Sequence, residues 1–163
     1  MDNKTPFYHL HKKHDAKLVS FADYMMPIQY KGVNFEHNHV RNHVGLFDVS
    51  HMAQIIIKGP EAFNLVQILT TNDISKLSDG KVQYSCMLND KGGILDDLLV
   101  YRINSNKYML VVNASNSEKD YKWICIHNNY KAQVNNITKK QAILSVQGPD
   151  SLDLLQSLTD FNI

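Results

Sequence analysis

Two adjacent carboxylates, Asp96 and Asp97, are the side chains of this sequence whose type and setting best suit chemistry. They lie in an apolar run that follows the glycine-containing turn at 89–93. Side chains alternate across a strand, so a strand here points the two carboxylates to opposite faces. A carboxylate among apolar residues is costly without a partner, so at least one should be functional or capped. The alternative is ordinary: an acid beside a glycine turn often only accepts backbone N–H bonds.

The predicted strand gives each aspartate different neighbours. One face carries Leu95, Asp97, Leu99 and Tyr101, and the other carries Ile94, Asp96, Leu98 and Val100. The pattern by itself favours a structural role for Asp96 and leaves the role of Asp97 open.

Composition limits the classes of protein to which the chain can belong. The 163 residues, 44% of them hydrophobic, can bury one ordinary core and the start of a second. Basic and acidic residues number 17 and 16 and are scattered, so neither nucleic acid nor a membrane is expected as a partner. Cys86 and Cys125 lie in apolar runs and are predicted to be buried free thiols of a reducing compartment.

The N-terminus resembles neither a signal peptide nor a transit peptide. A bacterial cytoplasmic location is therefore expected, or the mitochondrial matrix if the chain is a processed eukaryotic protein. No apolar run approaches membrane-spanning length.

Periodicity and turn residues predict the elements that position the two aspartates. Thr5-Pro6 indicates a helix to about residue 13 with Thr5 as its N-cap, and a loop is expected around 25–27. A helix over 34–44 should bury Phe35, Val40 and Val44 and stop at Gly45. Other helices are predicted over 59–69, 117–127 and 149–158, and strands over 16–21, 51–58, 82–88, 94–102, 108–113 and 142–147. The strands at 82–88, 94–102 and 108–113 should form an antiparallel meander.

A strand–Gly-Pro–helix unit occurs twice. IIIKGPEAFNLVQILT (55–70) aligns without gaps to LSVQGPDSLDLLQSLT (144–159). The repeat predicts an α+β fold with helices packed on one face of an antiparallel sheet. The expected divisions are 1–50, 51–140 and 141–163, with the last the start of a second unit in an incomplete chain.

The histidines suggest a metal site only weakly. His39 and His43 lie four residues apart on a predicted helix, with His37 close by. No further ligand pattern completes a site, so we expect a solvated helix face and no metal. His51 has no nucleophile partner and is predicted to be a hydrogen-bonded structural residue.

Four segments in order resemble the aminomethyltransferase, or T-protein, family of the glycine cleavage system. They are VGLFDVSHM (44–52), TND (71–73), GGILDDL (92–98) and VVNA (111–114). The resemblance covers essentially the whole chain but only about the first half of a typical family member. It implies a three-domain cloverleaf built around tetrahydrofolate, with antiparallel sheets and packed helices.

The implied reaction is a one-carbon transfer. The aminomethyl group on the lipoyl arm of the H-protein gives its methylene to folate N5, and ammonia and the dihydrolipoyl protein are released. The protein must align two reactants and stabilise positive charge as the C–N bond breaks. Tetrahydrofolate and the lipoylated H-protein are thus the implied cofactor and partner.

The resemblance assigns the site residue by residue. Asp97 matches the motif's folate-facing aspartate and is expected to be catalytic, whereas Asp96 is expected to bind backbone. Leu99 and Tyr101 match pocket positions. Met52, Tyr84 and Asn113 match folate contacts. Each also has a structural alternative: Met52 could be part of the strand core, Tyr84 a core ring with a solvent-exposed hydroxyl, and Asn113 the cap of a turn.

The sequence departs from the family pattern at the rim of the expected pocket. Ala53 and Gln54 replace a glycine and an acid, and Asp23-Tyr24 replaces a Gly-Trp pair. Other site residues of the family lie beyond Ile163, so little transferase activity is expected of this chain alone. Alternatives are a non-catalytic folate-binding or interaction remnant, and a folate-dependent iron–sulfur assembly relative.

Overall fold

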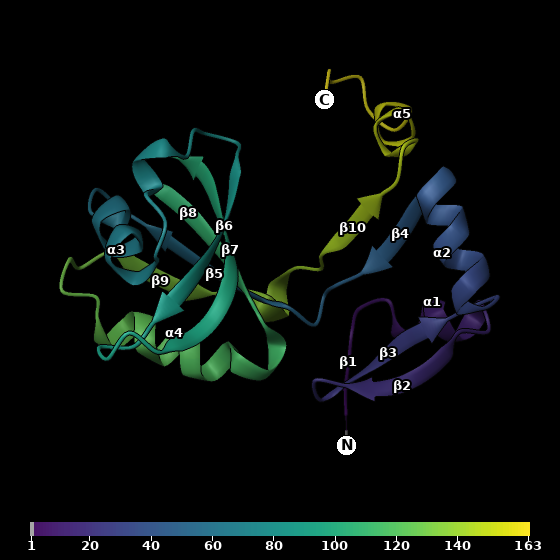
Figure 1. Ribbon diagram of the computed structural model, residues 1–163, viewed down its shortest axis with the longest axis horizontal. Helices are drawn as coiled ribbons and strands as arrows, with labels where there is room; N and C mark the ends of the chain where they lie inside the picture. The colour runs from purple at the N-terminus through teal and green to yellow at the C-terminus, as the bar shows by residue number, and fades with distance from the viewer. Residues whose placement is uncertain (1) are drawn as a thin grey trace. The chain divides into compact units, whose positions relative to one another are not determined.

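The computed structural model describes residues 2–163, which divide into two compact units. One contains the chain up to His51 together with Ala142–Ile163, and the other contains Met52–Gln141. We call them the split unit and the sheet unit (Figure 1). The divisions expected at 1–50, 51–140 and 141–163 run close to these bounds, but the first and last segments belong to one compact unit.

The sheet unit is built on five antiparallel strands in the order β6-β7-β8-β5-β9. The strands are β5 (Ala53–Lys58), β6 (Val82–Leu88), β7 (Ile94–Asn104), β8 (Lys107–Val112) and β9 (Gln133–Asn136). The helices are α3 (Ala62–Leu69), α4 (Ser117–Ile126) and the short 3-10 turns η1 (Ile74–Lys76), η2 (Ala114–Asn116) and η3 (Thr138–Lys140). The predicted meander of β6, β7 and β8 is confirmed.

Helices α3 and α4 pack on one face of this sheet. The apolar positions of α3 recur at helical spacing, and Leu65, Val66 and Leu69 enter one cluster with Ile124 of α4. The strands supply every second residue to the same cluster, for example Leu98 and Val100 of β7. The opposite side, which we call the open face, carries the intervening residues.

The split unit holds a small sheet in the order β1-β3-β2 and a separate two-stranded ladder of β4 with β10. Its strands are β1 (Asn3–Lys4), β2 (Lys17–Phe21), β3 (Tyr24–Gln29), β4 (Gly45–Asp48) and β10 (Leu144–Gln147). Its helices are α1 (Tyr8–Lys13), α2 (Val33–Asn42) and α5 (Ser151–Gln156). Antiparallel sheets with packed helices confirm the expected α+β class.

Three expectations about the split unit are wrong. Residues 25–27 form part of β3, where Pro27 lies next to a register shift and beyond the pairing with β1. Phe7, not Thr5, occupies the N-cap of α1, and Thr5 is buried. Helix α2 ends at Asn42 and buries no residue, so Phe35 is exposed and Gly45 opens β4.

The cysteines also differ from expectation. Both are free, but Cys86 is half-buried and Cys125 is exposed. Cys86 points to the open face because it alternates with the buried Ser85 and Met87.

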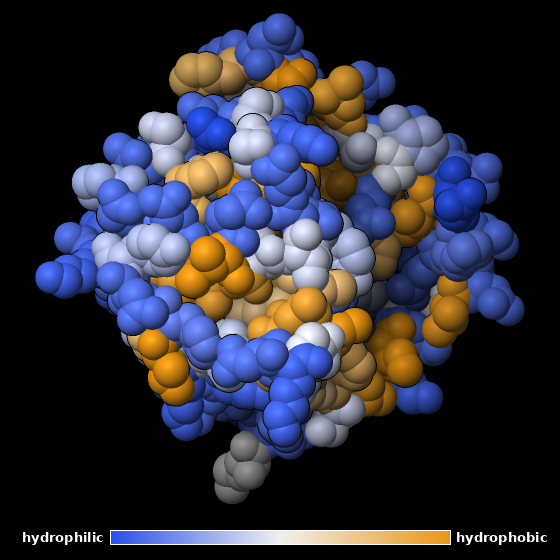
Figure 2. Space-filling model, turned by 60° about the vertical axis from the view of Figure 1, so that its left-hand side comes forward, coloured by the Kyte–Doolittle hydropathy of each residue, from blue (hydrophilic) through white to orange (hydrophobic). Residues whose placement is uncertain are grey.

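The surface on the α3 side of Figure 1 mixes apolar and polar groups. Figure 2 shows separate apolar patches among hydrophilic side chains there. Exposed apolar residues of the sheet unit include Ile68, Ile94 and Ile126. Within residues 2–163, no helix has the length and apolar character needed to cross a membrane.

Candidate functional site

Burial along β7 separates the two aspartates as their alternation predicts. Asp96 is only 4% exposed and shares its face with the buried Leu98 and Val100. Asp97 is exposed and shares the open face with the half-buried Leu99 and Tyr101. The two carboxylates therefore belong to different environments, one inside the protein and one on its surface.

The strand register brings the predicted site residues to one region of the open face. Asp97 pairs with Cys86, and the pairing of Leu98 with Val112 places Asn113 beside Asp97. Ala53 also pairs with Val112, so Met52 lies at the same end of the sheet as Asn113. The next row across the open face is Tyr84, Leu99, Val111 and Gln54, and the row after it contains Tyr101 and Met109.

Asp97 is held through both of its carboxylate oxygens. The Tyr84 hydroxyl donates to Oδ2 at 2.6 Å, and the Asn113 side-chain amide donates to Oδ1 at 3.1 Å. The hydrogen bond to Asp97 raises the pKa of the Tyr84 phenol, so the phenol keeps its proton as a donor. Tyr84 is 62% exposed, which excludes the alternative of a core ring.

Asp96 is a structural acceptor. It receives the Asn113 backbone N–H at 3.0 Å, the Asn113 side-chain amide at 2.9 Å and the Asn116 side-chain amide at 2.7 Å. Burial would raise the pKa of Asp96, but hydrogen bonds from Asp120, Asn113 and Asn116 outweigh it and lower the pKa. The expected backbone contact is confirmed.

Asn113 links the two aspartates instead of capping a turn. Its side-chain nitrogen lies within 3.1 Å of the Asp97 backbone oxygen and of carboxylate oxygens from both acids. Although Asn113 precedes η2, its side chain makes no cap bond there. The result is an exposed carboxylate in a fixed orientation, at one end of a face that also carries the half-buried Met52, Leu99 and Tyr101. Such a surface suits a flat ring that carries N–H groups or positive charge.

Sequence reasoning missed two polar residues around this site, Asn116 and Asp120, and named Gln54 only as a departure from the family pattern at the pocket rim. Gln54 is buried on the open face, and its side-chain nitrogen has no partner among residues 2–163. Asn116 binds Asp96, and Asp120 is fully buried on α4. Helical spacing could have revealed Asp120, because it lies one turn before the buried Ile124.

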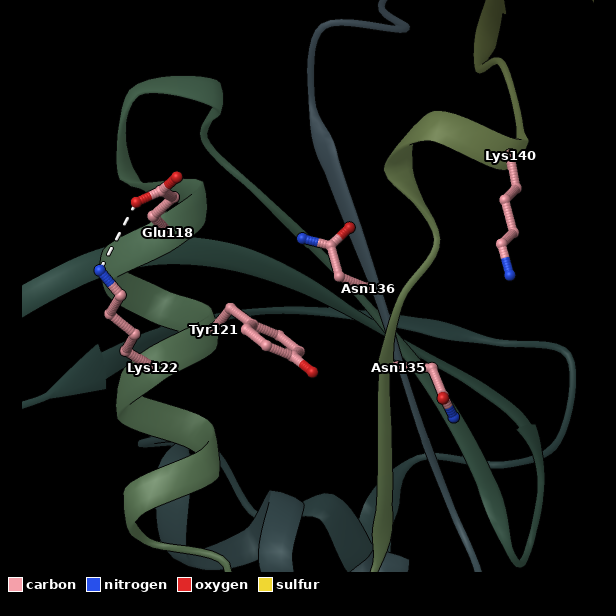
Figure 3. A pocket seen from close by; sticks show the side chains of 6 residues that line it. All are labelled: Glu118, Tyr121, Lys122, Asn135, Asn136 and Lys140. Atoms are coloured by element: carbon pink, nitrogen blue, oxygen red, sulfur yellow. Dashed lines mark ion pairs between the residues drawn. The ribbon is translucent and has the colours of Figure 1, made fainter.

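Two hollows lie elsewhere in the sheet unit. One, of about 500 Å³, is lined by Glu118, Tyr121, Lys122, Asn135, Asn136 and Lys140 (Figure 3). The other, of about 220 Å³, includes Trp123, His127 and Asp90 in its lining. No predicted site residue lines either one. On the open face itself, Asp97 and Tyr84 are exposed, whereas Gln54 and Val111 are buried.

The histidines of α2 and His43, its C-cap residue, are exposed to solvent as expected. His39 and His43 are exposed with ring centroids 5.1 Å apart, and His43 contacts the Asp150 carboxylate at 3.3 Å. Among residues 2–163 the buried Nδ1 atom of His51 has no hydrogen-bond partner, so the hydrogen bond expected of this residue is not found there. Its ring instead packs edge-on against Phe21, and burial lowers its pKa. Within the described residues, no cluster of three or more metal-ligating side chains occurs.

The comparisons with known proteins decide the family. The domain family described as the GCVT N-terminal domain matches residues 7–163. The chain belongs to this family. The resemblance seen in the four sequence segments is thereby confirmed.

Relatives within the family are aminomethyltransferases by name. The protein from Flavobacterium psychrophilum is 50% identical over 159 residues, covering 98% of this chain and 44% of its own length. The protein from Caldanaerobacter subterraneus is 51% identical, with the same coverage. The chain thus spans under half the length of these family members. Both relatives are named aminomethyltransferases, and neither name supports the remnant or the iron–sulfur alternative.

Solved structures agree with the family fold. The crystal structure of the glycine cleavage system aminomethyltransferase T from Bartonella henselae matches with a TM-score of 0.91 and 36% identity, covering 96% of this chain and 44% of that one. A heterotetrameric sarcosine oxidase from Corynebacterium matches with a TM-score of 0.58 and 11% identity, which shows a shared fold alone.

Proposed function

We propose that the sheet unit carries the tetrahydrofolate site of an aminomethyltransferase of the glycine cleavage system. The observation that carries this proposal is the fixed carboxylate of Asp97, bound by Tyr84 and Asn113 on the open face. Family membership supports it, because relatives covering 98% of the chain are named aminomethyltransferases. The protein is then a transferase that works with a bacterial H-protein in the cytoplasm.

The proposed reaction moves one carbon between two bound reactants. The aminomethyl group on the lipoyl sulfur of the H-protein gives its methylene to the folate, and ammonia and the dihydrolipoyl protein leave. The folate nitrogen is the nucleophile, so this chain need not supply one. Its task is to align the reactants and to stabilise the positive charge that develops.

Asp97 is the residue proposed to perform that task. Its carboxylate is an acceptor for a folate N–H and a negative charge beside the amine that leaves. Tyr84 and Asn113 fix both oxygens, so the carboxylate does not reorganise as the charge develops. The polar edge of the folate ring would face Asp97, while Met52, Leu99 and Tyr101 would contact its flat surface.

The first test is calorimetric titration of this chain with tetrahydrofolate. Asp97→Asn keeps the size of the side chain but removes its charge, so we expect affinity to fall about tenfold or more. Asp160→Asn removes a charge from an exposed acid far along the chain and should bind like the parent. Equal binding by all three proteins would refute the role of Asp97.

The second test is methylene transfer from aminomethylated H-protein. The chain spans 44% of the length of its relatives, so by itself it should turn over slowly or not at all. Joined to the remaining length that its relatives have, it should transfer, and Asp97→Asn should lower kcat. A rate like that of a whole relative from these 163 residues alone would contradict this expectation.

A further inference from the structure

Asp120 is a buried acid that the proposed reaction does not use. It lies on α4 and is 0% exposed, facing the covered side of the sheet. Neither carboxylate oxygen has a hydrogen-bond donor among the described residues. A charged carboxylate buried without donors is strongly disfavoured, so Asp120 requires either a proton or a partner.

Asp96 is the partner. The two side chains are within hydrogen-bonding reach of each other, yet both are acceptors when ionised. One proton between them resolves the conflict, as it does for any two carboxyl groups that share a site. Asp96 already receives three N–H donors from Asn113 and Asn116, whereas Asp120 receives none. The proton therefore belongs to Asp120.

The other charge near Asp120 does not change this conclusion. Lys119 lowers the pKa of Asp120 slightly, but its ammonium group is bound to the Leu95 carbonyl at 2.6 Å and to Asn116 at 3.0 Å. Burial, followed by the hydrogen bond to Asp96 and its charge, raises the pKa of Asp120 to about 8.

Asp96 connects this pair to the open face. One of its oxygens binds the backbone N–H of Asn113 and the other binds the Asn113 side chain, which also contacts Asp97. We propose that Asp120 is a positioning residue: as a neutral acid it donates to Asp96 and so holds Asn113 against Asp97. Only the expected change in folate affinity rests on the proposed folate site; the contact between Asp120 and Asp96 does not.

Loss of the Asp120 proton should disturb this chain of contacts. Two adjacent buried carboxylates would repel, and Asp96 would lose one donor and move relative to Asn113. Asp97 would then be fixed through Tyr84 alone. Folate affinity should fall above about pH 8, by up to tenfold for each further pH unit.

The test pairs two variants with a pH titration of the whole chain. Asp120→Asn keeps a donor for Asp96 but cannot ionise, whereas Asp120→Leu removes the donor. Nuclear magnetic resonance follows the aspartate carboxyl carbons and the side-chain amide of Asn113 between pH 5 and pH 10, without folate. We expect one aspartate to titrate near pH 8 and the Asn113 amide to shift with it. Asp120→Asn should abolish both changes.

Folate titrations complete the test. The unsubstituted chain should lose folate affinity above pH 8, and the Asp120→Asn variant should keep its folate affinity over the same pH range. An Asn113 amide that stays unmoved while Asp120 titrates, or no aspartate titrating above pH 6, would overturn the proposal. The resonance measurements need no ligand, so they support or overturn the role of Asp120 even if folate does not bind. They also remain decisive if Asp120→Leu does not fold.

Discussion

The two copies of the strand–Gly-Pro–helix unit have nearly the same local structure and opposite surroundings. Gly59 and Gly148 adopt φ values of 122° and 120°. In the first copy the Gln67 side chain accepts the Ile74 N–H at 2.8 Å, and in the second Gln156 accepts the Ile163 N–H at 3.2 Å. The repeated sequence thus specifies the same turn and the same helix-end contact.

The copies differ in what their helices cover. Leu65, Val66 and Leu69 of α3 are buried against the five-stranded sheet, with Leu65 0% exposed. The matching leucines of the second copy, 154, 155 and 158, are exposed, and Leu158 is 75% exposed. The first strand, β5, has neighbours on both sides, whereas within the described residues β10 pairs with β4 alone. Local sequence therefore sets the shape of each copy, while a neighbouring sheet sets how much that copy adds to stability.

The largest expected difference between the two units is in how their stability depends on pH. Asp120 in the sheet unit holds its proton to about pH 8, against about 3.9 in an unfolded chain. The contribution of Asp120 to the free energy of unfolding is greatest below pH 4. It falls by roughly 1.4 kcal/mol for each pH unit as the pH rises toward 8. Urea unfolding followed by Trp123 fluorescence should show this fall, and Asp120→Asn should flatten it. A parent stability that rises from pH 5 to 8 would contradict the expectation.

Asp48 in the split unit should respond in the opposite sense. Burial opposes its ionisation, but hydrogen bonds from Ser50 and His11 outweigh burial and lower its pKa. Its stabilising effect is therefore present above pH 4 and is lost as pH falls through the folded-state pKa. Circular dichroism during acid titration should show the split unit losing structure at low pH, and Asp48→Asn should remove that part of the pH dependence.

Truncating matched leucines tests the comparison directly. Leu65→Ala should destabilise the protein by about 2–5 kcal/mol, because it leaves a cavity in a closed core. Leu154→Ala, at the matching position of α5, should cost less than about 1 kcal/mol, because that side chain is already exposed. Urea unfolding followed by circular dichroism gives both values. Equal costs would show that α5 packs as tightly as α3.

Replacing the glycine of each copy by alanine should cost more stability in the second copy than in the first, the reverse of the order expected for the leucines. Both have a positive φ that disfavours a side chain, so alanine costs about 1–3 kcal/mol at either position. At Gly148 a Cβ atom would also lie 2.1 Å from the backbone oxygen of His43, whereas at Gly59 it would meet nothing. Gly148→Ala should therefore lower the thermal midpoint more than Gly59→Ala. The reverse order would contradict the close approach at Gly148.

Replacing the matched glutamines, Gln67 and Gln156, should give the smallest difference in stability between the two copies. Gln67→Ala and Gln156→Ala each remove one acceptor for a backbone N–H, at a cost of about 1 kcal/mol. Gln67 serves the buried residue Ile74, whereas Gln156 also donates to the Thr159 and Phe161 carbonyls at 3.0 and 2.9 Å, so the two costs should be similar. Amide hydrogen exchange at Ile74 and Ile163 measures each contact directly. Unchanged exchange at Ile74 in Gln67→Ala would show that this bond does not protect it.

The parts of the fold that the sequence predicted well are those with local signals. β6 runs over Val82–Leu88 as expected, because alternating residues and the nearby glycine turn are read from a short window. β1 and β9 were missed because each is short and polar, and only its pairing partner makes it a strand. Phe35 was expected in a core, but helical spacing shows only which face of a helix is apolar, not whether anything covers it.

The same limit applies to the candidate site. The sequence predicted that Asp96 and Asp97 point to opposite faces, because side chains alternate along any strand. The contact between Asn113 and Asp97 depends on the register of β7 against β8, which a single strand does not reveal. Asp120 lies further along the chain on another element, so its approach to Asp96 required the packing of α4 on the sheet.

The strand pairings also imply an order of folding. β6, β7 and β8 pair in sequence through short turns, so the meander that carries Asp97 closes small loops at little entropic cost. The ladder of β4 with β10 joins Asp48 to Leu144, which are separated by the entire sheet unit. During synthesis, the meander of β6, β7 and β8 can form before the second strand of that ladder has left the ribosome. Nascent chains of increasing length should therefore acquire the Tyr84–Asp97 contact well before the split unit resists proteolysis.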